Sequence, residues 1–238
     1  MIKAVLLDLF GTVVGYGDVL EGTRLAWEGI YAVLQSLGTT VPYERFAPDW
    51  QTQLTTPVAP EEEMAETPFL DKMLRLFRSH GLPPDAAAAK IAADRCLAGW
   101  DAHITLPEDT IPTLRALRKN YAVALVSNFD HPPYVHDLLS RHRLAGLFDH
   151  VTISGDIRID KPDPRIFQIA LAALGCRPQE AVFVGDSLRV DVDGARAVGC
   201  RPVLIDMKGR HGGYTGEKIQ SLSELLALLD GWRDASQG

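Results

Sequence analysis

The chain has 238 residues, 46% of them hydrophobic and 23% charged, a composition typical of globular proteins. Long disordered, collagen-like and fibrous classes are therefore excluded. With 24 basic and 31 acidic residues the formal net charge is −7, and no basic cluster is longer than Arg118-Lys119. Nucleic-acid binding is not expected, because phosphate backbones require a basic surface. At roughly 150 residues per domain, the length predicts one to two domains.

Hydropathy and cysteine content indicate the compartment. The longest stretch without a charged side chain, Gly29 to Tyr43, has only 15 residues, too few to cross a membrane as a helix. The N-terminal apolar run Ala4 to Leu7 ends at Asp8, which is too short for the core of a signal peptide. We therefore expect a cytoplasmic protein without membrane association. The three widely spaced cysteines are expected to be buried free thiols: Cys96, Cys176 and Cys200.

Five short apolar runs, each bounded by turn residues, predict the strands of a sheet. The first, residues 2–7, ends at Asp8 and is followed by Gly11-Thr12. Four later runs have the same character: residues 121–127, 150–154, 181–185 and 201–206. Helical patterns lie between and after them: residues 108–119, 133–144, 164–174, 191–198 and 221–229. This alternation predicts an α/β fold, with a parallel sheet covered by helices on both faces.

Residues 16–100 interrupt the alternation, since they contain helical patterns and no strand pattern. The helical patterns cover residues 19–37, 43–53, 68–80 and 85–100. Because the insertion follows the Asp8 loop, we expect a cap over the carboxyl ends of the strands, where ligands bind in open α/β sheets. The predicted core is residues 1–15 and 101–238, and the predicted helical cap is residues 16–100. A second helical domain without a lid role is the alternative.

Side chains capable of chemistry follow four of the predicted strands or the loops after them. They form four clusters: Asp8 to Thr12, Ser127-Asn128, Lys161 to Pro164, and Gly185 to Ser187 with Asp191. A carboxylate at a strand end can act as a nucleophile or ligate a cation, and hydroxyl and ammonium groups can neutralise a phosphoryl group. A second carboxylate across the crevice suits Mg²⁺, which prefers one or two carboxylates plus water and substrate oxygens.

In this order the four clusters resemble the four motifs of the haloacid dehalogenase-like (HAD) hydrolase superfamily, with a helical cap inserted after the first motif. The resemblance spans essentially the whole chain. It implies a Rossmann-like core and a reaction in which the first aspartate attacks phosphorus to form an aspartyl-phosphate that water then cleaves. It also implies a small-molecule substrate and Mg²⁺ as cofactor, and leaves the substrate's identity and the oligomeric state open.

The resemblance gives three residues a role in the reaction. Asp8 matches the nucleophile, Ser127 the hydroxyl that hydrogen-bonds the phosphoryl group, and Lys161 the lysine that balances the negative charge. Two more residues are expected to contact the substrate: Thr12 and Asn128. From the sequence itself, Asp163 is expected to cap the helix that Pro164 opens, which places Lys161 just ahead of that helix.

The resemblance also predicts a metal site. Asp8, the backbone carbonyl of Phe10 and Asp186 would hold the ion. Asp191, five residues after Asp186, matches a position that supports the metal site and Lys161.

Phe10 departs from the pattern of the superfamily's phosphatases. They usually carry a second aspartate two residues after the nucleophile, which protonates the leaving oxygen and later activates water. A phenyl ring has no proton to give, so an acceleration of about 10²–10⁴-fold would be missing unless another group supplies it. Four residues are candidates for that group: Asp130, Tyr16, Asp18 and Glu21.

Phe10 and Asp186 favour different reactions. The 2-haloacid dehalogenases carry an aromatic residue at the position of Phe10 and displace halide from carbon without a metal. Where this chain has Gly185-Asp186-Ser187, the dehalogenases have a pattern similar to Ser-x-Asn. An aspartate at this position would repel Asp8 unless a cation lies between the two carboxylates. We therefore predict Mg²⁺-dependent hydrolysis of a small phosphate ester through an aspartyl-phosphate on Asp8. Halide displacement through an aspartyl ester is the first alternative, and a ligand-binding protein without turnover is the second.

Overall fold

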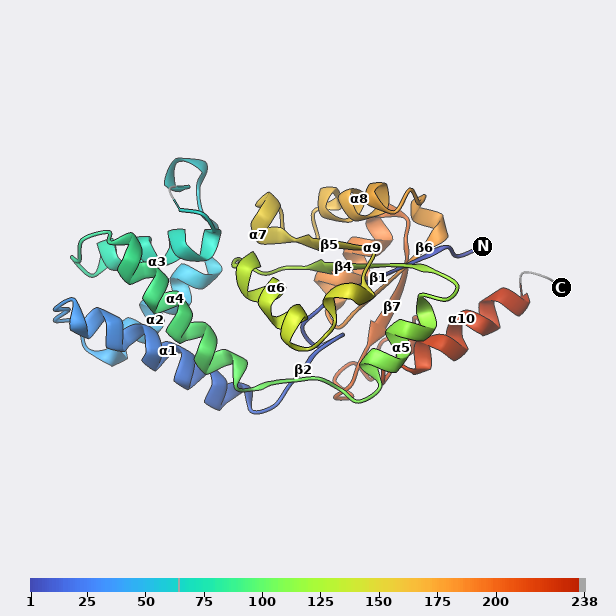
Figure 1. Cartoon of the computed structure of the whole chain (residues 1–238), viewed down its shortest axis with the longest axis horizontal. Helices are drawn as coiled ribbons and strands as arrows, with labels where there is room; N and C mark the ends of the chain where they lie inside the picture. The colour runs from blue at the N-terminus through green and yellow to red at the C-terminus, as the bar shows by residue number, and fades with distance from the viewer. Residues whose placement is uncertain (64, 236–238) are drawn as a thin grey trace. The chain divides into compact units, whose positions relative to one another are not determined.

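The computed structural model describes residues 1–63 and 65–235, and the chain divides into two compact units (Figure 1). The sheet unit comprises Met1–Gly15 and Thr105–Gly238, and the helical unit comprises Tyr16–Ile104. The sequence places the second boundary after residue 100. In the structure it falls after Ile104, because helix α4 continues to Asp101 and a two-residue strand follows it.

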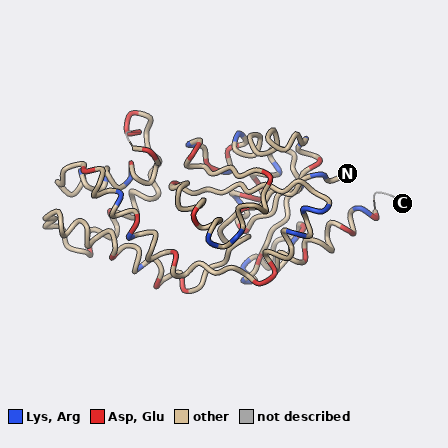
Figure 2. Tube along the Cα trace, in the orientation of Figure 1, with Lys and Arg blue, Asp and Glu red and all other residues tan. Residues whose placement is uncertain are grey.

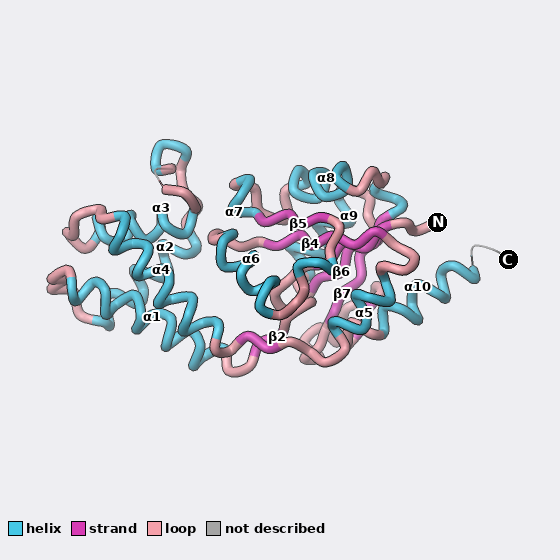
Figure 3. The backbone as a smooth tube through the Cα atoms, in the orientation of Figure 1, coloured by secondary structure: helices cyan, strands magenta, loops and turns pink. Residues whose placement is uncertain are grey.

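The sheet unit is built on a six-stranded sheet of order β5-β4-β1-β6-β7-β8 within the described residues (Figure 3). The strands are β1 (Ala4–Leu7), β4 (Ala122–Ser127), β5 (His150–Ile153), β6 (Ala181–Gly185), β7 (Arg201–Ile205) and β8 (Lys218–Ile219). Each neighbouring pair is parallel, which confirms the predicted α/β fold. In the register, Leu7 at the end of β1 lies beside Leu125 of β4 and Val184 of β6. The residue after Leu7 therefore emerges near the middle of the carboxyl edge.

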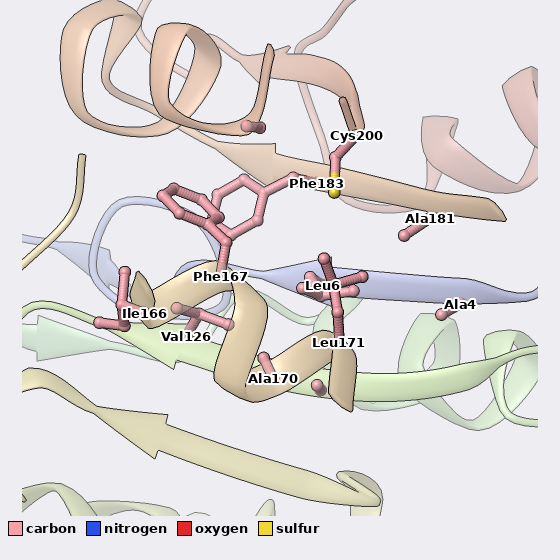
Figure 4. Packing of buried hydrophobic residues seen from close by; sticks show 12 residues of the cluster. Ala4, Leu6, Val126, Ile166, Phe167, Ala170, Leu171, Ala181, Phe183 and Cys200 are labelled. Atoms are coloured by element: carbon pink, nitrogen blue, oxygen red, sulfur yellow. The ribbon is translucent and has the colours of Figure 1, made fainter. Parts of the chain in front are cut away.

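Both faces of the sheet are buried, as a parallel sheet requires. Alternate strand residues share a face, and one face packs against Ile166 and Phe167 of helix α8 (Pro164–Ala173), as Figure 4 shows. The rings of Phe167 and Phe183 meet edge to face, 5.0 Å apart. The alternate residues on the opposite face are also fully buried: Val5, Leu7, Val123, Leu125, Val182 and Val184.

The remaining helical segments of the sheet unit are α5 (Thr110–Leu117), α6 (Pro132–Arg141), η2 (Ala145–Leu147), α7 (Ser154–Ile157), η3 (Pro178–Glu180), η4 (Leu188–Val192), α9 (Asp193–Val198) and α10 (Glu224–Ala235). Of these, α5, α6, α9 and α10 agree with the sequence patterns in type and differ at their ends, whereas η2, α7 and η3 were not predicted. The segment expected to be one helix over residues 191–198 begins instead with η4, a π-helical turn, before α9.

Four α-helices and one short 3₁₀ turn form the described part of the helical unit. They are α1 (Val19–Ser36), α2 (Tyr43–Thr55), η1 (Pro60–Glu62), α3 (Pro68–Ser79) and α4 (Ala86–Asp101). Three begin at a side-chain cap, since Asp18, Thr67 and Asp85 accept hydrogen bonds from backbone N–H groups of α1, α3 and α4. The short strands β2 (Gly15–Tyr16) and β3 (Ile104–Thr105) form a separate two-stranded sheet.

Charges of both signs are interspersed along the helices of both units (Figure 2). In the described part of the chain, no helix combines the length and apolar character needed to cross a bilayer. All three cysteines are free thiols, as predicted; Cys96 and Cys200 are buried, and Cys176 is partly exposed.

Candidate active site

Asp8 follows β1 directly, and its carboxylate is held at the carboxyl edge of the sheet. Its backbone N–H donates to the carbonyl of Val184 at 2.9 Å, which extends the pairing of β1 with β6 by one residue. The loop then folds tightly on itself, because the carbonyl of Leu9 accepts hydrogen bonds from the N–H groups of Val13 and Val14, both at 2.9 Å. Asp8 is only 7% exposed, so its carboxylate is both fixed and largely removed from water.

Two glycines allow the backbone to approach the carboxylates of the site closely. Gly11 has a positive φ of 88°, and a Cβ at this position would lie 2.4 Å from Oδ2 of Asp186. At Gly185, the last residue of β6, a Cβ would lie 2.4 Å from the Asp191 carboxyl carbon. Any side chain at either glycine would therefore displace a carboxylate. The loops after β1 and β6 approach each other through bare backbone.

Lys161 joins two of these carboxylates. Its Nζ donates to Oδ1 of Asp8 at 2.6 Å and to Oδ1 of Asp191 at 2.8 Å, and all three residues are buried. The other oxygen of Asp191 accepts from the backbone N–H of Ser187 at 3.0 Å. As expected from the sequence, Asp163 caps the helix that follows Lys161, accepting from the N–H of Arg165 at 2.9 Å. The structure thus brings the first, third and fourth clusters together.

Burial and charge act against each other in this group. Burial raises the pKa of Asp8 to about 7 although the Lys161 ammonium opposes the shift, and the carboxylates of Asp191 and Asp186 raise it further. Burial also raises the pKa of Asp186. For Lys161 burial would lower the pKa, but Asp8 and Asp191 outweigh it and the pKa is raised.

The residues present fit a hard cation. Oxygens of Asp8, Asp186 and Asp191 lie within 4.8 Å of one another. If all three carboxylates are ionised, one ammonium leaves two uncompensated negative charges in a partly buried space, and a cation would offset them. Carboxylate oxygens are the donors that Mg²⁺ and Ca²⁺ prefer. The cluster could therefore bind a metal ion, and Phe10, whose carbonyl the sequence adds to this set, lies on the same loop as Asp8.

Two of the three buried hydroxyls that lack a hydrogen-bond partner among the described residues lie near Asp8. Oγ1 of Thr12 and Oγ of Ser127 belong to fully buried residues, and neither has a hydrogen-bond partner among the described residues. Thr12 lies on the loop after β1, and Ser127 ends the adjacent strand β4. Buried hydroxyls are normally hydrogen-bonded, so an unpartnered one indicates a missing acceptor. An anionic oxygen at this edge of the sheet would satisfy them.

Asn128 makes a contact that the sequence did not indicate. Its side-chain amide donates to the carbonyl of Lys161 at 2.9 Å and accepts from the N–H of Lys161 at 2.7 Å. Both ends of the amide are therefore engaged with the backbone of the third cluster. The predicted contact of Asn128 with substrate stays a prediction, whereas its contact with Lys161 is part of the fold.

An aromatic stack takes the place of the second aspartate. The ring of Phe10 stacks on that of Phe129 with centroids 5.1 Å apart and planes at 29°. Phe129 stacks in turn on Tyr134 of α6, at 5.3 Å and 27°. Sequence reasoning considered Phe10 alone. The signal for its partner was the phenylalanine two residues after Ser127, matching Phe10 two residues after Asp8.

Two of the four candidate substitute acids have partners in the structure, and one loop was missed from the sequence. Asp18 caps helix α1 by accepting from the N–H of Glu21, and the carboxylate of Glu21 is paired with Arg24. Asp206 after β7 was not singled out, although its strand ends in a carboxylate as β1 does. Its oxygens accept from the N–H groups of Arg210 and His211 at 2.7 and 2.9 Å, which fixes the loop carrying His211.

The site thus consists of carboxylates at the carboxyl edge of a parallel sheet, two of them bound by a buried lysine. The chain belongs to the haloacid dehalogenase-like hydrolases, a family that matches residues 2–199. Its relatives include both phosphatases and a dehalogenase.

Three relatives illustrate this range. The chain is 43% identical over 100 residues to the phosphoserine phosphatase of Thermus thermophilus, covering 42% of this chain and 40% of that protein. It is 30% identical to the glyceraldehyde 3-phosphate phosphatase of Methanopyrus kandleri, covering 90% and 86%. It is 33% identical to (S)-2-haloacid dehalogenase 4A of Burkholderia cepacia, covering 57% and 60%. The chain spans less than two thirds of the length of the first three curated relatives that it matches.

Solved structures give the same result for the fold. A HAD phosphatase from Thermococcus onnurineus superimposes with a TM-score of 0.68 at 28% identity, covering 96% of this chain and 98% of that one. The predicted Rossmann-like architecture and hydrolase family are thus confirmed.

Proposed function

We propose that the protein hydrolyses a small phosphate monoester, with Asp8 as the nucleophile and Mg²⁺ as the cofactor. The observation that carries the proposal is the grouping of Asp8, Asp186 and Asp191, in which the Lys161 ammonium contacts two of the three carboxylates. This arrangement suits a dianionic phosphate group that binds together with a cation. It suits a substrate that binds without a metal ion less well. The two phosphatase relatives support the same reaction.

In the first step a carboxylate oxygen of Asp8 attacks phosphorus, and the bond to the leaving oxygen breaks. Lys161 holds Oδ1 of Asp8 at 2.6 Å, so it fixes the rotation of the carboxylate and offsets charge that gathers on the phosphoryl oxygens. The hydroxyls of Thr12 and Ser127 provide hydrogen bonds to those oxygens, which also satisfies both buried groups. In the second step water attacks phosphorus and releases Asp8 and phosphate.

The metal ligands in this proposal are Asp8, the carbonyl of Phe10, and Asp186, with Asp191 positioning Lys161 and the Ser187 backbone. When bound, Mg²⁺ supplies positive charge that stabilises the phosphoryl oxygens in the transition state. The chain's own part is to hold the carboxylates at the correct spacing. The helical unit serves as the cap in this proposal, and the substrate is a small molecule.

A parallel assay tests the proposal. Phosphate release from a panel of metabolite phosphates and halide release from 2-haloacids are measured with and without Mg²⁺. The expected result is phosphate release that needs Mg²⁺ and is abolished in Asp8→Asn. Asp137→Asn is the matched control, because it makes the same chemical change at a surface carboxylate, paired with Arg141 on helix α6. Full activity in Asp8→Asn would refute the covalent mechanism.

The alternative function is halide displacement from a 2-haloacid by Asp8. The observation that favours it is Phe10, an aromatic side chain where phosphatases of the superfamily carry a second aspartate, and a 2-haloacid dehalogenase is among the relatives. Halide release without Mg²⁺ in the same assay would establish this alternative. Binding of ligand without any turnover that depends on Asp8 would establish a non-catalytic protein.

A further inference from the structure

A cavity of about 560 Å³ lies at the amino edge of the sheet, opposite the edge that carries Asp8. Four neighbouring strands line it with residues at, or within two positions of, their first residue: Ile2 for β1, Tyr121 for β4, Gln179 for β6 and Arg201 for β7. Asp8 follows the other end of β1, six residues after Ile2, which is roughly 20 Å of extended chain. The cavity is therefore separate from the candidate active site.

Helix α10 contributes Leu229, Trp232 and Arg233 to the lining. The Arg233 guanidinium donates to the Tyr121 hydroxyl at 2.9 Å, which ties the helix to the start of β4. The Arg201 guanidinium lies over the Trp232 ring, 3.4 Å from the ring centroid. Each of the two guanidinium groups is thus held beside the cavity by an aromatic side chain.

The charge of the lining favours an anionic ligand. Among the described residues that line the cavity, the charged side chains are Arg201 and Arg233. Their carboxylate partners, Glu217 and Asp230, lie outside the lining at 2.9 and 3.1 Å. Both ion pairs are exposed to water, and such pairs contribute little to stability. A guanidinium has five N–H donors in one plane, so each arginine can bind a further carboxylate while it keeps its present contacts.

The size of the cavity and its aliphatic side chains favour a ligand with an apolar body. Ile2 and Leu229 supply aliphatic surface, and Leu229 is buried. The volume falls within the range of about 300–1,000 Å³ in which proteins bind small organic molecules, and such sites combine apolar walls with a few fixed polar groups. An inorganic anion would leave the aliphatic surface in contact with water. The cavity therefore suits a molecule that joins one anionic group to an apolar body.

We propose that this cavity is a second ligand site, which binds a small organic carboxylate with an apolar body. The carboxylate accepts hydrogen bonds from the guanidinium groups of Arg201 and Arg233, and the apolar body occupies the space beside Ile2 and Leu229. Planar guanidinium groups bind carboxylates in a fixed and often bidentate geometry. The inference does not depend on the reaction proposed for Asp8, since none of the described lining residues belongs to that site.

Isothermal titration calorimetry of the full chain measures binding, with 2-naphthoate as the probe because its carboxylate is attached to a rigid apolar ring system. We expect 2-naphthoate to bind about 10-fold or more tightly than either acetate or uncharged 2-naphthol. Acetate lacks the apolar body, and 2-naphthol lacks the negative charge. Equal binding of 2-naphthol would refute the role of the arginines, and equal binding of acetate would refute the role of the apolar body. Absence of 2-naphthoate binding would overturn the inference as a whole.

A variant tests whether the probe occupies this cavity. Arg201→Gln removes one guanidinium, and we expect it to raise the Kd of 2-naphthoate about 10-fold or more. Arg196→Gln is the matched control, because it makes the same change at an exposed arginine of the sheet unit, paired with Asp193 outside the lining. The control should leave the Kd unchanged. An Arg201→Gln variant that melts like the wild-type protein and binds 2-naphthoate equally well would refute the site.

The indole N–H signals of the tryptophans in NMR spectra locate the probe directly. The chain has four tryptophans; Trp232 lies in the sheet unit, whereas Trp27, Trp50 and Trp100 lie in the helical unit. The ring current of bound 2-naphthoate should shift the signal of Trp232, which is assigned through Trp232→Phe, and leave the other three in place. A Trp232 signal that does not move at saturating 2-naphthoate would overturn the inference, whatever the other signals do.

Discussion

The side chain of Asn128 hydrogen-bonds to both backbone groups of Lys161, at 2.7 Å to the N–H and at 2.9 Å to the carbonyl. A carboxamide has one acceptor and one donor group in a fixed plane, so this pairing fixes the backbone on both sides of the lysine. The two residues are 33 positions apart in the sequence. Because Asn128 directly follows strand β4, these hydrogen bonds fix the Lys161 backbone relative to the end of that strand. They thereby help to position the ammonium that contacts Asp8.

Replacing Asn128 by Asp should weaken both stability and turnover. A carboxylate oxygen would face the Lys161 carbonyl in place of a donor, and the unmade hydrogen bond should cost about 1–3 kcal/mol of unfolding free energy. Displacement of the ammonium should lower kcat by on the order of 10²-fold, with a smaller effect on KM. Urea denaturation and steady-state kinetics measure the two effects. Asn120→Asp, the same change at an exposed residue, should alter neither, and an unimpaired Asn128→Asp would disprove the positioning role.

Ser127→Ala should separate stability from activity. The hydroxyl of Ser127 is fully buried without a partner among the described residues, so its removal relieves a desolvation cost and should leave the melting temperature equal or higher. Turnover should fall by about 10²-fold if this hydroxyl binds a phosphoryl oxygen. Ser154→Ala is the control, because that equally buried hydroxyl accepts from the Phe129 N–H at 3.0 Å and its loss should lower the melting temperature. Destabilisation of both variants alike would contradict this explanation.

Lys161→Met should make folding depend on a divalent cation. Removing the ammonium leaves the carboxylates of Asp8 and Asp191 buried without their partner, which should cost about 3–5 kcal/mol of unfolding free energy in the absence of metal. Added Mg²⁺ should restore part of this loss, and the rise in melting temperature with Mg²⁺ should exceed that of the wild-type protein. Lys72→Met, at a similarly buried lysine that donates to the Leu54 carbonyl, should show no such gain from Mg²⁺. A Lys161→Met variant indifferent to the ion would argue against the metal site.

Asp163→Asn should alter how stability responds to acid. The hydrogen bond from the Arg165 side chain, together with that from its backbone N–H, lowers the pKa of Asp163 from 3.8 to about 2. A depressed pKa means that the contribution of Asp163 is present above about pH 4 and is lost as the pH falls towards 2. Melting temperatures measured from pH 7 to pH 2 should therefore fall less in Asp163→Asn than in the wild-type protein over the acid part of this range. Asp94→Asn, at an exposed carboxylate, should follow the wild-type curve, and parallel curves for all three proteins would contradict the prediction.

Much of the fold could be predicted from the sequence, because apolar runs that end in turn residues are a local signal. The strand that ends before Asp8 and the strand that ends at Ser127 were both predicted from their own residues. Strand β8 was missed, since Lys218–Ile219 is too short to show a pattern. The π-helical turn Leu188–Val192 was missed as well, because the helical pattern in the sequence begins only at residue 191.

The contacts between loops could not be predicted in this way. Asn128 meets Lys161, and Phe10 meets Phe129, only after the sheet has ordered its strands as β5-β4-β1-β6-β7-β8. No periodicity in the sequence encodes the distance between two loop side chains. The family resemblance supplied roles for Asp8 and Lys161, but it could not show that an aromatic partner accompanies the substitution at Phe10.

The bare backbone at Gly11 and Gly185 has an evolutionary consequence. The spacing of the carboxylates depends on two positions where no side chain fits. We therefore expect both positions to stay glycine in functional variants. The rings of Phe10 and Phe129 stack through side chains alone, so a substitution at either position meets no such backbone restriction. A change at either glycine would move a carboxylate, whereas a change at either ring would alter only what lies beside the loops after β1 and β4.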